Sequence, residues 1–299
     1  MATAKKAPAK PKVPTTQELA ARYGYAITFF NSDPELKALL AKAQKANWDV
    51  ANFQAAIRNT KWWKARSDAQ RNFDIGVKTD PGEWKRRATE ARIKLQQQAA
   101  QMGVTVSASW LTKMANQFVR NGATDQEIAA SLASVWHTQF AADQEKATTG
   151  TAGDVVGQLR EMASAYGYPL GDDRLNQQVT DVLAGNKQAK DYEETYKMWA
   201  KKNFAGVADL IDAGQTVADI LDPYTQIASQ ELGASKAAML PNDPKWQKAL
   251  LGAQGGPMSL SDWRTTIRTD SQYGWDQSRS AQDDAYKLAA GLSQMFQGG

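Results

Sequence analysis

The sequence predicts an all-α protein: a multi-helix array of short helices with weak internal repeats, preceded by a disordered or extended basic N-terminal arm. Three observations support this prediction. Apolar residues recur at spacings of three and four, as in Leu36, Leu39 and Leu40. Alternating β-branched runs are nearly absent, residues 104–106 excepted. Helix-start motifs recur along the whole chain.

Two kinds of motif predict where helices begin. In an Asp-Pro pair, aspartate caps the free amides of a helix and proline takes the first helical position. The four pairs are Asp33-Pro34, Asp80-Pro81, Asp222-Pro223 and Asp243-Pro244. In a capping box, a hydroxyl residue and an acid three positions later satisfy two amides reciprocally. The five boxes begin at Thr15, Thr124, Thr216, Ser259 and Ser280.

Two weak repeats suggest how the helices are organised. Residues 99–140 and 163–204 share apolar and glycine positions at an offset of 64 residues. Residues 53–70 and 263–282 share an amphipathic segment that ends in Ile-Arg and is followed by aromatic residues. We therefore expect an arm at 1–17, an N-terminal module at 18–92, two related units at 93–204 (about 93–145 and 153–204) and a C-terminal module at 205–299.

The net charge of the chain equals that of the arm. Residues 1–17 carry no acid and four lysines, Lys5, Lys6, Lys10 and Lys12, so the remaining residues sum to zero. The Ala/Lys/Pro composition cannot bury enough surface to order the arm by itself. The arm is either an electrostatic tether for nucleic acid or an acidic partner, or a solubilising tail. The tether hypothesis predicts DNA binding that weakens with salt and vanishes when residues 1–17 are removed.

The best candidate for an interaction patch on the body is a basic and aromatic cluster. It consists of Lys61, Trp62, Trp63, Lys64 and Arg66. Tryptophans beside cations can stack on bases or sugars. However, the ten tryptophans are spread over most of the chain, which favours packing between helices. Neighbouring residues on a helix do not share a face, so Trp62 and Trp63 must point differently.

The residues give little support to an enzyme. Without cysteine there is no thiol nucleophile or thiolate metal site, and His137 lies in no catalytic or zinc motif, so we expect a helix-surface or partly buried histidine. The adjacent acids Asp172-Asp173 and Asp283-Asp284 fit helix starts better than a glycosidase pair. Residues 252–256 lack a phosphate-loop lysine and are interpreted as a linker. We expect no cofactor, no metal, no signal peptide and no membrane span.

An ordered set of motifs resembles virion structural proteins, described as internal virion or minor tail proteins, of tailed bacteriophages that infect actinobacteria. The motifs are Tyr23-Gly24-Tyr25-Ala26, Asp33-Pro34-Glu35-Leu36, Trp48, Phe53-x-x-x-Ile57-Arg58-x-Thr60-x-Trp62-Trp63, Ala213-Gly214-Gln215-Thr216-Val217-Ala218-Asp219-Ile220-x-Asp222-Pro223-Tyr224, Asp243-Pro244, Pro257-Met258-Ser259-Leu260-x-Asp262-Trp263 and Ile267-Arg268-x-Asp270. The resemblance covers roughly residues 18–298. The chain departs from the family pattern at residues 270–275, where similar chains have a compact Asp-Pro-x-Trp.

The resemblance implies a non-enzymatic component of the head interior or of the tail or neck that aids particle assembly and DNA delivery. Its expected partners are other virion proteins, such as portal, tail or neck components, and further copies of itself in a homo-oligomer. The expected location is the virion, with the host cytoplasm during assembly. The alternatives are a nucleic-acid-binding protein that acts through its arm, and a cell-wall-degrading enzyme, which has the least support.

Overall fold

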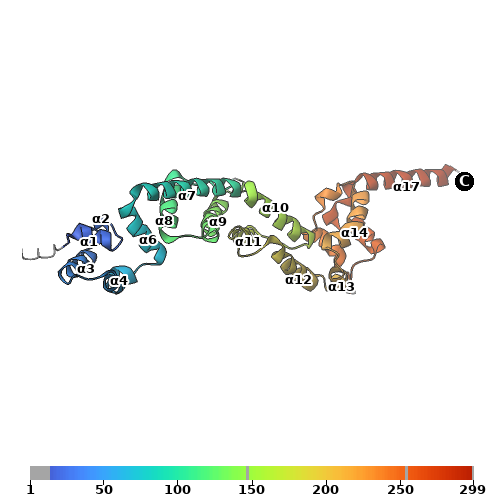
Figure 1. The fold of residues 1–299 in the computed structure, drawn as a ribbon. Coiled ribbons are helices and arrows are strands. Elements are labelled where there is room, and N and C mark those ends of the chain that lie inside the picture. Colours follow the sequence, from blue (N-terminus) through green and yellow to red (C-terminus); the bar gives the residue numbers. More distant parts are fainter. Residues whose placement is uncertain (1–13, 146–147, 253–254, 298–299) are drawn as a thin grey trace, which may run out of the picture. The chain divides into compact units, whose positions relative to one another are not determined.

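The computed structural model describes residues 14–145, 148–252 and 255–297, and these residues form helices and connecting turns without a strand (Figure 1). The all-α prediction is confirmed for this part of the chain, including residues 104–106, which are irregular. Residues 1–13, with the four lysines of the arm, lie outside the described residues. None of the described helices has the length and apolarity that a bilayer span requires.

The chain divides into two compact units. Unit 1 comprises residues 1–101 and 105–128, and unit 2 comprises residues 102–104 and 129–299. The finer division into an arm and modules at 18–92, 93–204 and 205–299 stays a prediction. The α-helices that begin in unit 1 are α1 (Thr16–Arg22), α2 (Ile27–Asn31), α3 (Pro34–Lys45), α4 (Val50–Arg58), α5 (Lys61–Lys64), α6 (Asp68–Thr79), α7 (Pro81–Met102), α8 (Ala108–Asn121) and α9 (Asp125–Ala142).

Unit 2 contains both α-helices and short 3-10 turns. Its α-helices are α10 (Gly150–Ala165), α11 (Asp172–Leu183), α12 (Glu193–Asn203), α13 (Ala208–Asp212), α14 (Val217–Leu232), α15 (Pro244–Gln247), α16 (Leu260–Thr269) and α17 (Arg279–Gln297). The 3-10 turns are η1 (Ala189–Tyr192), η2 (Ala205–Val207), η3 (Lys236–Ala238), η4 (Lys248–Leu250), η5 (Ser271–Tyr273) and η6 (Trp275–Gln277). Helices such as α5 and α15 are only four residues long, which is too short to give a periodic signal in the sequence.

Three of the four Asp-Pro pairs begin helices as predicted. The carboxylate of Asp33 accepts the amides of Glu35 and Leu36, and Asp80 and Asp243 cap α7 and α15 in the same way. The prediction for Asp222-Pro223 is wrong, because Pro223 lies inside α14. α14 begins at the capping box of Thr216, and buried residues on both sides of Pro223 hold the helix together.

Four of the five capping boxes also begin helices where predicted, at Thr15, Thr124, Thr216 and Ser259. The prediction for Ser280 is wrong, since α17 already begins at Arg279. The hydroxyl of Ser280 donates to the carbonyl of Gln230 on α14, and the Ser278 hydroxyl accepts the amide of Ala281 instead. A tertiary contact therefore uses the side chain that would have capped the helix.

The core of unit 1 lies between α1 and α5 and is rich in aromatic rings. Tyr23 stacks on Phe53 with ring centroids 4.0 Å apart, and its hydroxyl donates to the carbonyl of Trp48 at 2.8 Å. Further along, α6 carries Gly76 where α7 presents Trp84. A Cβ atom at Gly76 would lie 1.8 Å from the Trp84 indole nitrogen, so glycine is required for this close approach.

In unit 2, α14 packs against α16 through Trp263. This side chain is fully buried, and its indole N–H donates to the carbonyl of Tyr224 at 2.9 Å. On the same pair of helices, the buried Glu231 accepts hydrogen bonds from Arg264 and Arg268 at 2.9 and 2.8 Å. Because both carboxylate oxygens are used, this acid ties α14 to α16 rather than lying unpaired in the interior.

The segments at an offset of 64 residues have the same local pattern. Left-handed glycines follow helix ends at Gly103 and Gly167, and the next helices begin at Ala108 and Asp172. Equivalent apolar positions are buried in both segments. The buried pairs are Ala99/Ala163, Leu111/Leu175, Ile128/Tyr192, Leu132/Tyr196 and Phe140/Phe204, and the buried pair Leu95/Leu159 precedes them at the same offset. The shared residues therefore specify packing and turns.

The two end segments also resemble each other locally. In α4 the buried pair is Phe53 and Ile57, and in α16 it is Trp263 and Ile267 at the same spacing. Each helix is followed by a residue whose side-chain oxygen caps a short helical turn, Thr60 before α5 in one case and Asp270 before η5 in the other. The two segments thus share a helix, a cap and a short turn that inserts an aromatic side chain.

Candidate functional site

The predicted patch at residues 61–66 forms the short helix α5 and the turn that follows it. A helix of four residues cannot satisfy its own first amides. Here the carboxylate of Glu35 on α3 accepts the amides of Lys61 and Trp62, each at 3.0 Å. The Thr60 hydroxyl accepts the amide of Trp63 at 3.2 Å. A side chain 26 residues away in sequence therefore supports α5.

The two tryptophans of the patch point differently, as predicted. Trp62 is 5% exposed and packs edge-on against Phe29, with ring centroids 5.0 Å apart. Trp63 is half-buried at the edge of the same core. The burial of Trp62 against Phe29 favours the packing interpretation of this side chain over a stacking platform.

Arginines cover the outer faces of both rings. The guanidinium of Arg66 lies 4.7 Å from the centroid of Trp62, and that of Arg71 lies 4.6 Å from the centroid of Trp63. Arg66 also donates to Asp74 at 2.8 Å and to the Trp62 carbonyl at 3.0 Å. These arginines stabilise the aromatic edge, whereas Lys61 and Lys64 are exposed. The patch therefore offers two exposed positive charges rather than an aromatic platform.

Replacing Glu35 by alanine is expected to lower the melting temperature of unit 1 at neutral pH. The amides of Lys61 and Trp62 favour the carboxylate form and hold the pKa of Glu35 below its ordinary value of 4.5. Its stabilisation is therefore complete above pH 4.5 and is lost as the pH falls through the lowered pKa. Thermal unfolding of wild type and Glu35→Ala should differ at pH 7, and the difference should shrink as the pH is lowered below 4.5.

The matched control for this prediction is Glu90→Ala on α7. The carboxylate of Glu90 pairs with the exposed Arg86 and accepts no backbone amide. We expect little change in melting temperature for this variant at either pH. A Glu35→Ala variant that melts with wild type at pH 7 would show that α5 does not need its distant cap.

The charges of the chain are segregated between the two units. Residues 1–128 contain 21 basic and 11 acidic residues, a net charge of +10, and residues 129–299 contain 15 and 21, a net charge of −6. Without the four arm lysines, unit 1 still carries +6. The zero sum over residues 18–299 conceals this difference, because the boundary between the units is not visible in the sequence.

Much of the positive charge of unit 1 is accessible. Within the described ranges, several exposed lysines of this unit make no ion pair, and they are Lys37, Lys45, Lys61, Lys64, Lys78, Lys85 and Lys113. They lie on α3, α5, α6, α7 and α8. Unpaired surface lysines retain their full attraction for polyanions. The lysines of the predicted patch are thus two of several exposed cations of unit 1 that make no ion pair.

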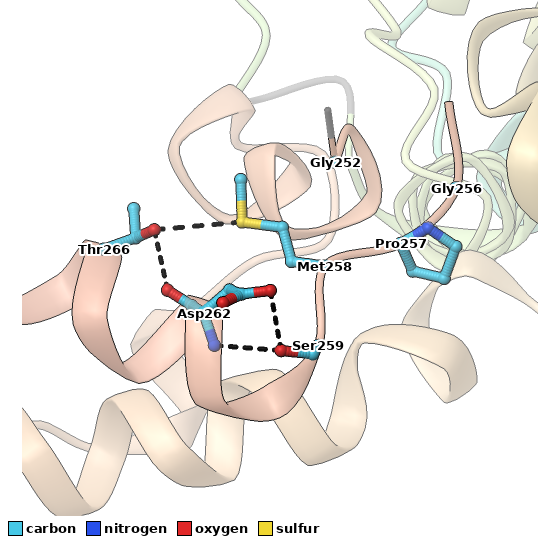
Figure 2. Close-up of a pocket in the computed structure, with 7 residues that line it drawn as sticks. All are labelled: Gly252, Gly256, Pro257, Met258, Ser259, Asp262 and Thr266. Carbon is cyan, nitrogen blue, oxygen red and sulfur yellow. Dashed lines mark hydrogen bonds between the residues drawn. The ribbon is translucent and has the colours of Figure 1, made fainter. Parts of the chain in front are cut away.

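A hollow of about 660 Å³ lies in unit 2 beside α16 (Figure 2). It is lined by Gly252, Gly256, Pro257, Met258, Ser259, Asp262 and Thr266. Asp262 is the one ionisable residue of this lining. Its carboxylate accepts a hydrogen bond from the Ser259 hydroxyl at 2.7 Å, and its backbone amide donates to the Ser259 hydroxyl oxygen. Asp262 is therefore part of the N-terminal cap of α16.

Three of the other residues considered for chemistry, His137, Asp172 and Asp284, have structural partners. His137 is exposed on α9, and its Nδ1 lies 3.2 Å from the Thr180 hydroxyl, which confirms a helix-surface histidine. Asp172 and Asp173 lie in the first turn of α11 as predicted, and Asp172 lies near Arg160. The helix-start prediction for Asp283 and Asp284 is wrong, because α17 begins at Arg279 and has no acid in its first turn; Asp284 instead lies 3.4 Å from Arg268. Among the described residues, no group of three or more histidines and acids is placed to hold a metal ion.

Two important acids were not singled out in the sequence. Glu35 has no local signal, since its partners lie 26 and 27 residues away. Glu231 does have a local sequence signal, because it lies on the same helical face as the buried Ile227 and Ala228, where a buried acid requires a partner. Comparison of the chain with known protein families, curated proteins and solved structures finds no match.

Proposed function

We propose that this protein is a non-enzymatic structural component of a tailed-bacteriophage particle, placed in the head interior or in the tail or neck, where it aids assembly and DNA delivery. The observation that supports this proposal is the position of the motif residues that resemble virion proteins. Asp33 and Asp243 cap helices, and Phe53, Trp62 and Trp263 are buried. A shared set of caps and core anchors is the signature of a shared scaffold rather than of shared chemistry.

Mass spectrometry of purified particles tests this proposal. Particles banded on a density gradient should contain the chain in multiple copies per virion. Separated heads and tails should then carry it in one fraction, which assigns its place. Gradient-purified particles that lack the chain, while the infected cells contain it, would overturn the proposal.

A second candidate function is binding of nucleic acid through unit 1 and the arm. The segregated charge favours it, because +10 on residues 1–128 is opposed by −6 on the remainder. Lysines that contact phosphates release condensed counterions, which drives binding without base recognition. This function is compatible with a particle component that contacts the packaged genome.

A further inference from the structure

The last helix of unit 2, α17, has a long segment that does not pack on the body. Its first turns are anchored, because Ser280 donates to the Gln230 carbonyl at 3.0 Å and Asp284 lies 3.4 Å from Arg268. From residue 285 to residue 294, every residue is exposed. These include large apolar side chains: Tyr286 is 76% exposed, Leu288 68% and Leu292 47%.

Apart from Tyr286, which lies beside the stripe, the apolar residues of α17 follow the spacing of a helix–helix seam that begins at the half-buried Ala281. Ala281, Ala285, Leu288 and Leu292 lie four, three and four residues apart, and in the sequence Met295 continues the series. Alternating steps of three and four place side chains in a single stripe that matches the same stripe on another helix. Such a stripe is typical of a helix that is covered by a partner.

The charges of the segment favour a second copy of the same helix. Between residues 285 and 297 the one charged residue is Lys287, whose side chain is 79% exposed. It lies away from the stripe. The positions that flank the stripe, Ala289 and Gly291, are small and uncharged, so identical helices bring no like charges together. A polyanion or an anionic membrane would require several cations on this helix.

The length of the segment favours more than two copies. Thirteen helical residues span about 20 Å. Two helices of that length bury much less than the roughly 1,200 Å² of a stable interface. Ala289 lies next to the stripe and makes the apolar face wider than the narrow seam of a two-helix coiled coil. A wider apolar face is typical of a helix that contacts two or more neighbours in a bundle. If the copies are related by closed cyclic symmetry, their α17 helices run parallel to one another around the symmetry axis.

We propose that α17 is a self-association helix that joins at least three copies of this chain in a parallel bundle through Ala285, Leu288 and Leu292. Light scattering coupled to size exclusion should give the full-length protein a mass of at least three times its 32.8 kDa. Leu288→Glu should reduce the mass to that of one chain, because every copy then brings a negative charge into the same Leu288 layer of the seam. The matched control Ala290→Glu, on the opposite face of the same helix, should keep the wild-type mass.

The absence of cysteine in the chain permits a second test of the same contact. Under mild oxidation, Leu288→Cys should form disulfide-linked pairs of chains and Ala290→Cys should remain unlinked. Both side chains are exposed in the single chain, so neither substitution disturbs the body, which far-UV circular dichroism checks. A wild-type mass of one or two chains, an unchanged mass for Leu288→Glu, or equal linking by both cysteines would overturn the proposal.

Discussion

Trp263→Ala is expected to destabilise unit 2 by about 3–5 kcal/mol, the range for deleting a large buried aromatic side chain. Trp263 is fully buried, packs edge-on against Tyr273 with ring centroids 5.4 Å apart, and donates its indole N–H to the Tyr224 carbonyl. The substitution removes the side chain that joins α14 to α16 and leaves a buried carbonyl without its donor. Urea unfolding followed by circular dichroism should show an earlier transition for unit 2.

Two comparison variants make this result specific. Phe53→Ala removes the equivalent anchor of α4 and should destabilise unit 1 by a similar amount, because Phe53 is also fully buried. Met198→Ala removes an exposed side chain of α12 in the same unit as Trp263 and should leave the unfolding free energy within about 0.5 kcal/mol of wild type. A Trp263→Ala protein that unfolds with wild type would mean that α14 and α16 do not depend on this anchor.

Duplex DNA binding by the full-length protein is expected to fall steeply with salt. If unit 1 and the arm neutralise six to ten phosphates, affinity should decrease by about 10³–10⁵ between 50 and 200 mM salt. Removal of residues 1–17 should weaken binding and lower the salt slope without abolishing binding, since unit 1 retains a net charge of +6. Fluorescence anisotropy with a labelled duplex at a series of salt concentrations measures both quantities.

Charge-reversal variants locate the DNA contact. Lys61→Glu with Lys64→Glu should weaken binding further, because both lysines are exposed on unit 1. The control Lys202→Glu changes an exposed lysine of the negatively charged unit 2 and should have little effect. Complete loss of binding on deletion of residues 1–17 would instead show that only the arm contacts DNA. Binding whose affinity does not change with salt would contradict both hypotheses, contact through unit 1 and contact through the arm alone.

Local chemistry made much of the fold predictable. The caps at Asp33, Asp243 and Thr216 depend on residues two or three positions away, so the sequence contains the whole signal. Pro223 and Ser280 were assigned wrongly because tertiary contacts decided them. Buried residues on both sides of Pro223 keep α14 continuous, and the hydroxyl of Ser280 donates to the carbonyl of Gln230 instead of capping α17.

The candidate patch was harder to predict than the fold. The sequence places cations beside Trp62 and Trp63, but the same pattern fits a binding platform and a packed edge. Burial decides between them for Trp62, and burial depends on Phe29, more than thirty residues earlier. The cap from Glu35 is likewise a long-range contact that no local spacing encodes.

The segregation of charge has a consequence for the behaviour of the protein in solution. The isoelectric point of about 9.0 is an average over two halves of opposite sign. At that pH the total charge is zero, but the positive and the negative excess still lie on different units. Copies in dilute buffer then attract one another through unlike halves over about a Debye length, which is roughly 30 Å at 0.01 M salt. Ionic strength, more than pH, should therefore govern its solubility and its retention on both cation and anion exchangers.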